Sequence, residues 1–243
     1  MKYFLSLLLL TFTLHPNEAQ AIIKKLEKNL RGDYMYSTMS MIVTSKHGKR
    51  TVKLESWSEG NEKSFIKILY PNKDRGITFL KIDNQMWQYI PKIERTMKIP
   101  PSMMLQSWMG SDFTNDDMVK ESSLEEDYHA KLLTKSGNTA TLELIPKEDA
   151  AVVWGKIIID VDLKNAVPIR ETFYDDLMQK VRIMTFSKVE QHGSHMVPMV
   201  MELIPLDENK KHNRTKIISE KVNYDAKIDP SYFTKQALKR YSR

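Results

Sequence analysis

The chain has 243 residues, contains no cysteine and carries a formal net charge of +6. The absence of cysteine excludes a disulfide-stabilised scaffold, so stability must come from a buried core. Basic and acidic residues are interspersed, which is typical of a solvated sheet face and argues against nucleic-acid binding. Because the sequence has no linker-like, repeated or low-complexity tract, residues 22–243 are expected to form a single domain.

The first 21 residues have the three parts of a secretory signal peptide. Lys2 supplies a positive start, and residues 3–14 form an apolar stretch that is too short to span a bilayer. Ala19-Gln20-Ala21 supplies the small-residue cleavage pattern. We therefore expect cleavage after Ala21 and a mature chain that is free outside the cytoplasm, in preference to a retained membrane anchor.

The start of the mature chain predicts a short amphipathic helix. Ile23, Leu26 and Leu30 recur at helical spacing, and Gly32 follows them as a C-terminal cap. From residue 34 to about residue 90 the period changes to two, and turn residues separate the apolar runs. This pattern predicts an antiparallel meander.

The middle of the chain breaks this alternation. Pro100-Pro101 interrupts it, and the next twenty or so residues indicate neither a strand nor a long helix. Alternation resumes at Lys131 and continues to residue 224, most clearly over residues 156–163. Asp229-Pro230 then indicates a capped helix at the end of the chain.

These elements predict a mainly β fold of the α+β class, with roughly eleven strands and helices near both ends. So many sequential antiparallel strands cannot stay flat, because their twist accumulates until the sheet curls. We therefore expect a strongly curved antiparallel sheet, or incomplete β-barrel, with helices covering its open side. Its apolar concave face must be filled by helices, by loops or by a ligand.

The sequence contains few of the motifs that indicate catalysis. It has no cysteine nucleophile, no G-x-S-x-G elbow and no phosphate-binding glycine loop. His192 and His195 could bind a metal, but no third ligand accompanies them, and a turn between strands is the favoured interpretation. We expect no enzyme activity, no cofactor and no metal site.

Two acidic stretches are disfavoured as a calcium site and as a hydrolase active site. Asp112, Asp116 and Asp117 lack the ligand spacing of a helix-loop-helix calcium site, so loop and capping roles are favoured. Glu125 and Glu126 could belong to a hydrolase of lipids or glycans. However, adjacent residues on a strand face opposite ways, and no second carboxylate pair is placed by the sequence.

Methionine is abundant, with fifteen residues in the chain. Several of them fall in or beside the irregular middle segment: Met97, Met103, Met104, Met109 and Met118. Flexible methionine side chains suit surfaces that receive varied apolar partners, but they also fill irregular cores. On composition alone, a plug beneath a loop is favoured over a contact with cargo.

A set of residues around the irregular segment resembles a known family. It comprises Tyr70-Pro71, Asp74-Arg75-Gly76, Leu80, Trp87, Tyr89, Pro91, Arg95, Trp108-Met109, Gly110, Ser111, Asp112, Phe113 and Asp116. In order and spacing these residues resemble the outer-membrane lipoprotein-sorting proteins of the LolA-like family. One departure is Trp108, which stands where phenylalanine is more usual.

The resemblance implies an incomplete β-barrel covered by helices, with a hydrophobic cavity between sheet and helices. Members of that family shield the acyl chains of lipoproteins that cross the periplasm. For this chain it implies a periplasmic location and a cargo of lipoprotein acyl chains or free lipid. An inner-membrane transporter and an outer-membrane acceptor are the implied partners. The alternative is a non-catalytic cell-envelope adaptor that works with an inner-membrane export pump.

The resemblance also suggests which residues contact cargo. The expected cover segment carries Met103, Met104, Leu105, Trp108, Met109 and Phe113. The sheet offers Trp57, Phe65, Phe79 and Trp87, whose faces the sequence does not assign. In the archetypal carrier a buried arginine latches the cover, and here Arg75, Arg95 and Arg170 all remain candidates for that role.

Overall fold

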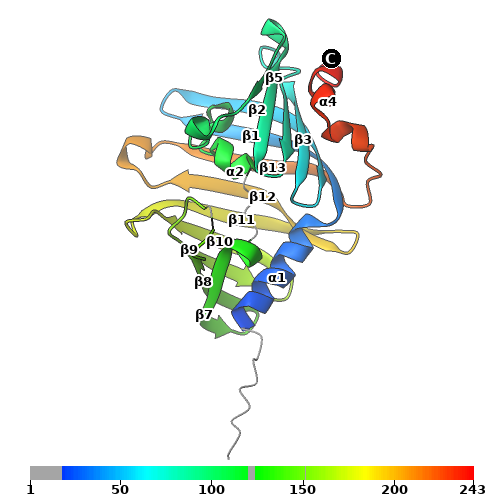
Figure 1. The fold of residues 1–243 in the computed structure, drawn as a ribbon. Coiled ribbons are helices and arrows are strands. Elements are labelled where there is room, and N and C mark those ends of the chain that lie inside the picture. Colours follow the sequence, from blue (N-terminus) through cyan, green and yellow to red (C-terminus); the bar gives the residue numbers. More distant parts are fainter. Residues whose placement is uncertain (1–17, 120–123, 151) are drawn as a thin grey trace, which may run out of the picture.

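The computed structural model describes residues 18–119, 124–150 and 152–243. Residues 1–17, most of the expected leader, lie outside the described residues. Within the described part, thirteen strands form one curved antiparallel sheet (Figure 1). The strands are β1 (Tyr34–Ser45), β2 (Gly48–Glu59), β3 (Lys63–Tyr70), β4 (Thr78–Ile82), β5 (Gln85–Ile90), β6 (Arg95–Lys98), β7 (Tyr128–Ser136), β8 (Thr139–Pro146), β9 (Lys156–Asp162), β10 (Val167–Tyr174), β11 (Lys180–His192), β12 (His195–Pro205) and β13 (Arg214–Asn223).

The sheet consists of two meanders joined in its centre. Strands β1 to β6 run from the centre to one edge, and β7 to β13 run back from the other edge until β13 pairs with β1. The edge strands β6 and β7 do not pair with each other, so the sheet is an incomplete barrel, as predicted. The chain between them is described over residues 99–119 and 124–127, and we call these residues the crossing segment.

Four α-helices and five short 3-10 helices accompany the sheet in the described residues. They are α1 (Glu18–Arg31), η1 (Pro91–Ile93), η2 (Pro101–Met103), η3 (Trp108–Gly110), α2 (Asn115–Val119), α3 (Leu124–Asp127), η4 (Glu208–Lys210), η5 (Pro230–Phe233) and α4 (Lys235–Arg240). None of the helices in this part of the chain is both long and apolar enough to cross a membrane.

The predicted ends of the fold are confirmed in outline. Gly32 follows α1 with a φ of +61°, the left-handed conformation expected of a glycine cap. The Asp229 carboxylate accepts a hydrogen bond from the Ser231 amide at 2.8 Å, as an N-cap does, but it begins η5. Thr234 then caps α4. The count of roughly eleven strands was low, partly because the four-residue β6 after η1 gives too short an alternation to detect.

Both faces of the sheet are covered. The inner face packs against α1 and the crossing segment in two clusters of buried side chains, and Ile217 of β13 contacts both clusters. On the outer face, Phe65, Leu80 and Trp87 pack beneath η5 and α4. Figure 1 shows α1 and α2 on one side of the strands and α4 beside β3. The inner face therefore carries two apolar clusters that meet at Ile217, beneath separate covering elements.

Candidate functional site

The crossing segment fills the middle of the inner face with aromatic side chains. Trp108 in η3 is 2% exposed, and its ring centroid lies 5.4 Å from that of Phe79 on β4. Phe113 is also buried, but it joins the cluster beneath α1. The segment thus bridges the two halves of the inner face.

The other predicted cover residues are less buried. Met104 and Met109 are partly buried and pack against the cluster that contains Trp108. Met103 and Leu105 are exposed, Leu105 by 67%. Met118 packs against the same cluster, so the methionine plug predicted from composition is partial: Met104, Met109 and Met118 join it, whereas Met103 does not.

The four predicted sheet residues separate onto opposite faces. Only Phe79 lies on the inner face, beneath Trp108. Trp57 stacks on Tyr232 of η5 with ring centroids 4.6 Å apart, and Phe65 and Trp87 share that outer-face cluster. Three of the four candidates therefore hold the C-terminal helices in place, and β-strand alternation accounts for the split.

The Met-Gly-Ser-Asp-Phe element forms a tight turn that ties the crossing segment to the sheet. Gly110 has a φ of +65°, and a Cβ there would lie 2.8 Å from Nη2 of Arg50. Arg50 donates a hydrogen bond to the carbonyl of Met109. The Asp112 carboxylate accepts a hydrogen bond of 2.7 Å from Oγ1 of Thr215 on β13. These residues act as structural anchors.

A buried ion pair holds the next part of the crossing segment. Arg182 on β11 donates two hydrogen bonds to the Asp117 carboxylate of α2, at 2.6 and 2.7 Å. The two side chains are 6% and 13% exposed. The guanidinium also lies 4.2 Å from the ring centroid of Trp154 and 4.5 Å from that of Phe173. We call this pair the α2 latch.

Sequence reasoning missed Arg182. The three arginines considered, Arg75, Arg95 and Arg170, are all exposed, and Arg170 pairs with Asp160 on the surface. The sequence places Arg182 on the same side of β11 as Met184 and Phe186, which could have marked it as an inward-facing charge. This could not be recognised because Val181 and Ile183 make the opposite side of the strand apolar as well.

A carboxyl group lies close to the latch. Glu171 on β10 is opposite Met184, one step along the inner face from the Phe173–Arg182 pair. Burial raises the pKa of Glu171 to about 7, and the positive charge of Arg182 acts in the opposite direction. This inner-face group therefore titrates near neutral pH.

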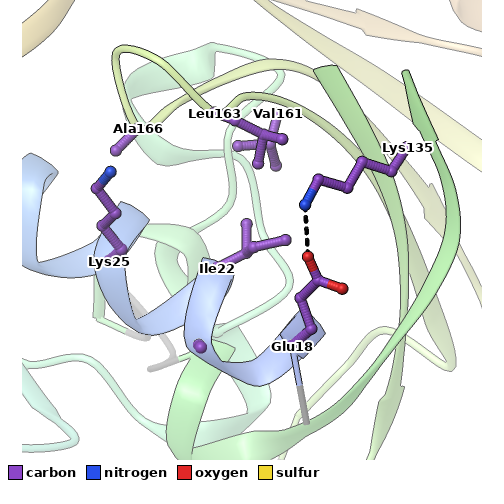
Figure 2. Close-up of a pocket in the computed structure, with 8 residues that line it drawn as sticks. Glu18, Ile22, Lys25, Lys135, Val161, Leu163 and Ala166 are labelled. Carbon is purple, nitrogen blue, oxygen red and sulfur yellow. Dashed lines mark hydrogen bonds and ion pairs between the residues drawn. The ribbon is translucent and has the colours of Figure 1, made fainter. Parts of the chain in front are cut away.

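A pocket of about 300 Å³ opens between α1 and the ends of β7 and β9 (Figure 2). Its apolar lining comes from Ala21, Ile22, Val161, Leu163 and Ala166. Glu18, Lys25 and Lys135 are exposed at its rim, and Nζ of Lys135 lies 2.6 Å from Oε1 of Glu18. Its volume is at the lower end of the range for small-molecule sites.

The first turn of α1 is well packed. Ala19 is fully buried, and the Gln20 side chain donates to the carbonyl of Glu125 and accepts from the amide of Ala130. The expected cleavage point after Ala21 falls inside α1, so cleavage there would remove these contacts.

Residues 60–240 match a protein-family model described as "Uncharacterized protein". The chain belongs to this family. No curated protein matches the sequence.

Solved structures show that the fold is LolA-like. A DUF1329 family protein from Desulfovibrio piger superposes with a TM-score of 0.82 at 20% identity, over 91% of this chain and 98% of that one. An outer-membrane lipoprotein-sorting protein domain from Vibrio parahaemolyticus gives 0.79 at 20% identity, over 92% and 99%. A LolA superfamily protein from Nitrosomonas europaea gives 0.75 at 19% identity, over 90% and 98%. The resemblance seen in the sequence is confirmed at the level of the fold.

In this LolA-like fold, the motif around β5 lies on the outer face. Trp87 and Tyr89 are buried beneath α4, and Pro91 begins η1. Gly76, with a φ of +83°, lies so close to the C-terminal segment that a Cβ would be 2.3 Å from the carbonyl oxygen of Ser242. Arg95 is exposed on β6. These motif residues therefore support the architecture around the site and are not among the residues that line the pocket.

Proposed function

We propose that this LolA-like protein is a periplasmic carrier that shields the acyl chains of a lipoprotein or lipid during transfer between the inner and outer membranes. The observation that carries this proposal is the arrangement of the inner face. It carries two apolar clusters that meet at Ile217, its pocket is open beside α1, and its middle is covered by a short segment with polar ties to the sheet.

An acyl chain needs such a surface in order to cross water. Each buried methylene contributes about 0.8 kcal/mol, so an unshielded chain stays in a membrane or aggregates. A carrier must bury the chain and later release it. This requires apolar surface and a movable cover, and no catalytic group, so we assign no catalytic role to any residue.

The crossing segment has the properties of a movable cover. Its polar attachments to the sheet include those of Arg50 to Met109, of Asp112 to Thr215, and of the α2 latch, and Gln20 of α1 donates to the carbonyl of Glu125. In addition, the Trp108 indole N–H is buried with no hydrogen-bond partner among the described residues. An unsatisfied buried donor costs about 1–3 kcal/mol, so the closed arrangement is not the most favourable one for this side chain. Opening would uncover Phe79 and its neighbours.

The proposal includes export and hand-over. Residues 1–21 act as a cleaved signal peptide, and residues 22–243 form the carrier domain in the periplasm. The donor is an inner-membrane transporter, and the acceptor lies in the outer membrane. The likeness to a lipoprotein-sorting domain and to a LolA superfamily protein supports this assignment.

Purified protein is expected to bind a fluorescent long-chain fatty acid with a dissociation constant in the low-micromolar range, about −8 kcal/mol. Fluorescence titration measures the affinity, and mass spectrometry of organic extracts from natively purified protein identifies the cargo. A folded sample that binds no acyl compound would contradict the proposal.

The absence of cysteine allows a clean control for opening of the cover. Cysteines introduced together as Asp112→Cys and Thr215→Cys, whose side chains are in contact, would tie the crossing segment to β13. The oxidised variant is expected to bind long-chain fatty acid at least tenfold more weakly than the same variant after reduction. Each single-cysteine variant serves as the matched control.

A second candidate function is a non-catalytic envelope adaptor that works with an inner-membrane export pump. The observation that favours it is the burial of Trp108, Phe113 and Tyr128, which fill the inner face from the crossing segment and β7. An adaptor of this kind carries no lipid in its extracts, and oxidation of the cysteine pair leaves its docking unchanged.

A further inference from the structure

A lysine occupies an inward-facing position at the mouth of the pocket. Lys135 on β7 is opposite Ala140 on β8, which is opposite Val161 on β9. Ala140 and Val161 are both buried in the cluster beneath α1. The register therefore places Lys135 at the end of an apolar row on the inner face. A charged side chain would normally occupy the opposite, solvent-facing side of the strand.

A second lysine approaches from the helix. Lys25 on α1 lines the same pocket, and Figure 2 shows Ile22 between Lys25 and Lys135, with Val161 and Leu163 close by. The pocket thus combines an apolar interior with ammonium groups contributed by two separate elements. This is the pattern expected of a site for an apolar chain that ends in a negative charge.

The Glu18 carboxylate at the rim would compete only weakly with an anionic ligand for Lys135. Glu18 pairs with Lys135, but the two side chains are 55% and 47% exposed. Exposed ion pairs contribute at most about 1 kcal/mol, so a ligand anion can take the place of Glu18. Cleavage after Ala21 would remove both Glu18 and Ala21 from the pocket, and the remaining lining would be Ile22, Lys25, Lys135, Val161, Leu163 and Ala166.

We propose that this pocket binds one acyl chain of an anionic amphiphile, a carboxylate or a phosphate, with the head group held between Lys25 and Lys135. The inference rests on the proposed carrier function and names the chemical class of its cargo. The chain lies against Ile22, Val161 and Leu163, and the anion replaces Glu18 as the partner of Lys135.

The competing explanation is protection of the sheet edge. β7 is an edge strand, and inward-pointing charges are one way in which proteins prevent edge-to-edge association. That role requires a charge on Lys135 but no preference for a ligand head group, and it gives no part to Lys25.

The test compares ligands that share a twelve-carbon chain, namely laurate, dodecyl phosphate, dodecanol and dodecyltrimethylammonium. Calorimetry at neutral pH is expected to show laurate and dodecyl phosphate binding about tenfold more tightly than dodecanol, and the cation most weakly. The double variant Lys25→Met/Lys135→Met is expected to lose this preference and keep its affinity for dodecanol. The control Lys24→Met/Lys28→Met removes two exposed lysines from α1, with the same change in charge.

Each outcome has a defined meaning. Equal binding of laurate and dodecanol by the unmodified protein overturns the anionic site and leaves the carrier proposal standing, whereas binding of neither overturns both. The site is also overturned if Lys24→Met/Lys28→Met loses the preference for anionic ligands as fully as Lys25→Met/Lys135→Met does. It is likewise overturned if the Lys25→Met/Lys135→Met variant aggregates but keeps that preference. In a chain whose mass shows that Glu18 is retained, Glu18→Gln is expected to strengthen laurate binding about threefold, which tests the site without removing either lysine.

Discussion

Replacing Arg182 with methionine is expected to lower the free energy of unfolding by about 3–5 kcal/mol, because it breaks a buried ion pair from one side. The Asp117 carboxylate, 13% exposed, would lose its partner without regaining full contact with water. The guanidinium also lies over Trp154 and Phe173, so its removal costs packing in addition to charge. Chemical denaturation measures the loss.

An exposed ion pair in the same half of the sheet provides the control. Arg170 pairs with Asp160 at 2.7 Å, but its side chain is 57% exposed. Arg170→Met is therefore expected to cost less than about 1 kcal/mol. Similar losses for Arg170→Met and Arg182→Met would show that the α2 latch contributes no more than an ordinary surface pair.

The latch prediction can be separated from general destabilisation. Arg182→Met combined with Asp117→Leu removes both charges, and it is expected to recover most of the stability lost by the single variant. Hydrogen exchange should rise in the crossing segment of the single variant and not in α4, which packs on the outer face of the sheet. In the proposed carrier the crossing segment competes with cargo for the inner face, so the single variant is also expected to bind long-chain fatty acid more tightly while it unfolds more easily.

Alternation in the sequence was enough to predict an antiparallel, curved sheet, but not the direction in which each side chain points. In β3 the residues Phe65, Ile66 and Ile68 are all buried, because η5 and α4 cover one face and the crossing segment covers the other. A strand covered on both faces loses the polar positions that normally mark the outside. This is why Trp57 and Phe65 could not be separated from Phe79 in advance.

The latch could not be predicted for a different reason. Arg182 and Asp117 are 65 residues apart, and they meet only because the chain crosses the whole inner face before it begins the second meander. α2 has five residues, too few for a helical period to show which side faces the sheet. The start of the crossing segment was predictable, because Pro100-Pro101 and the loss of alternation mark it.

Glu171→Gln is expected to remove a pH dependence of stability of about 2–3 kcal/mol. The pKa of Glu171 is about 7 in the folded protein, against an ordinary value of 4.5, chiefly because the carboxyl is buried. Below pH 4.5 the group is protonated in both the folded and the unfolded states, and its full contribution is present. As the pH rises towards 7 the unfolded chain releases this proton first, so stability falls by up to about 1.4 kcal/mol per pH unit.

Urea denaturation at pH 5 and pH 8 measures this contribution. The unmodified protein should be less stable at pH 8 than at pH 5 by about 2–3 kcal/mol. Glu171→Gln should reduce this difference. The control Glu190→Gln, which removes an exposed carboxylate from β11, should leave it unchanged. Equal pH dependence in all three proteins would refute the prediction. Because the charge of Arg182 lowers the pKa of Glu171, Arg182→Met should move the loss of stability to higher pH, which an NMR titration of the Glu171 carboxyl can follow directly.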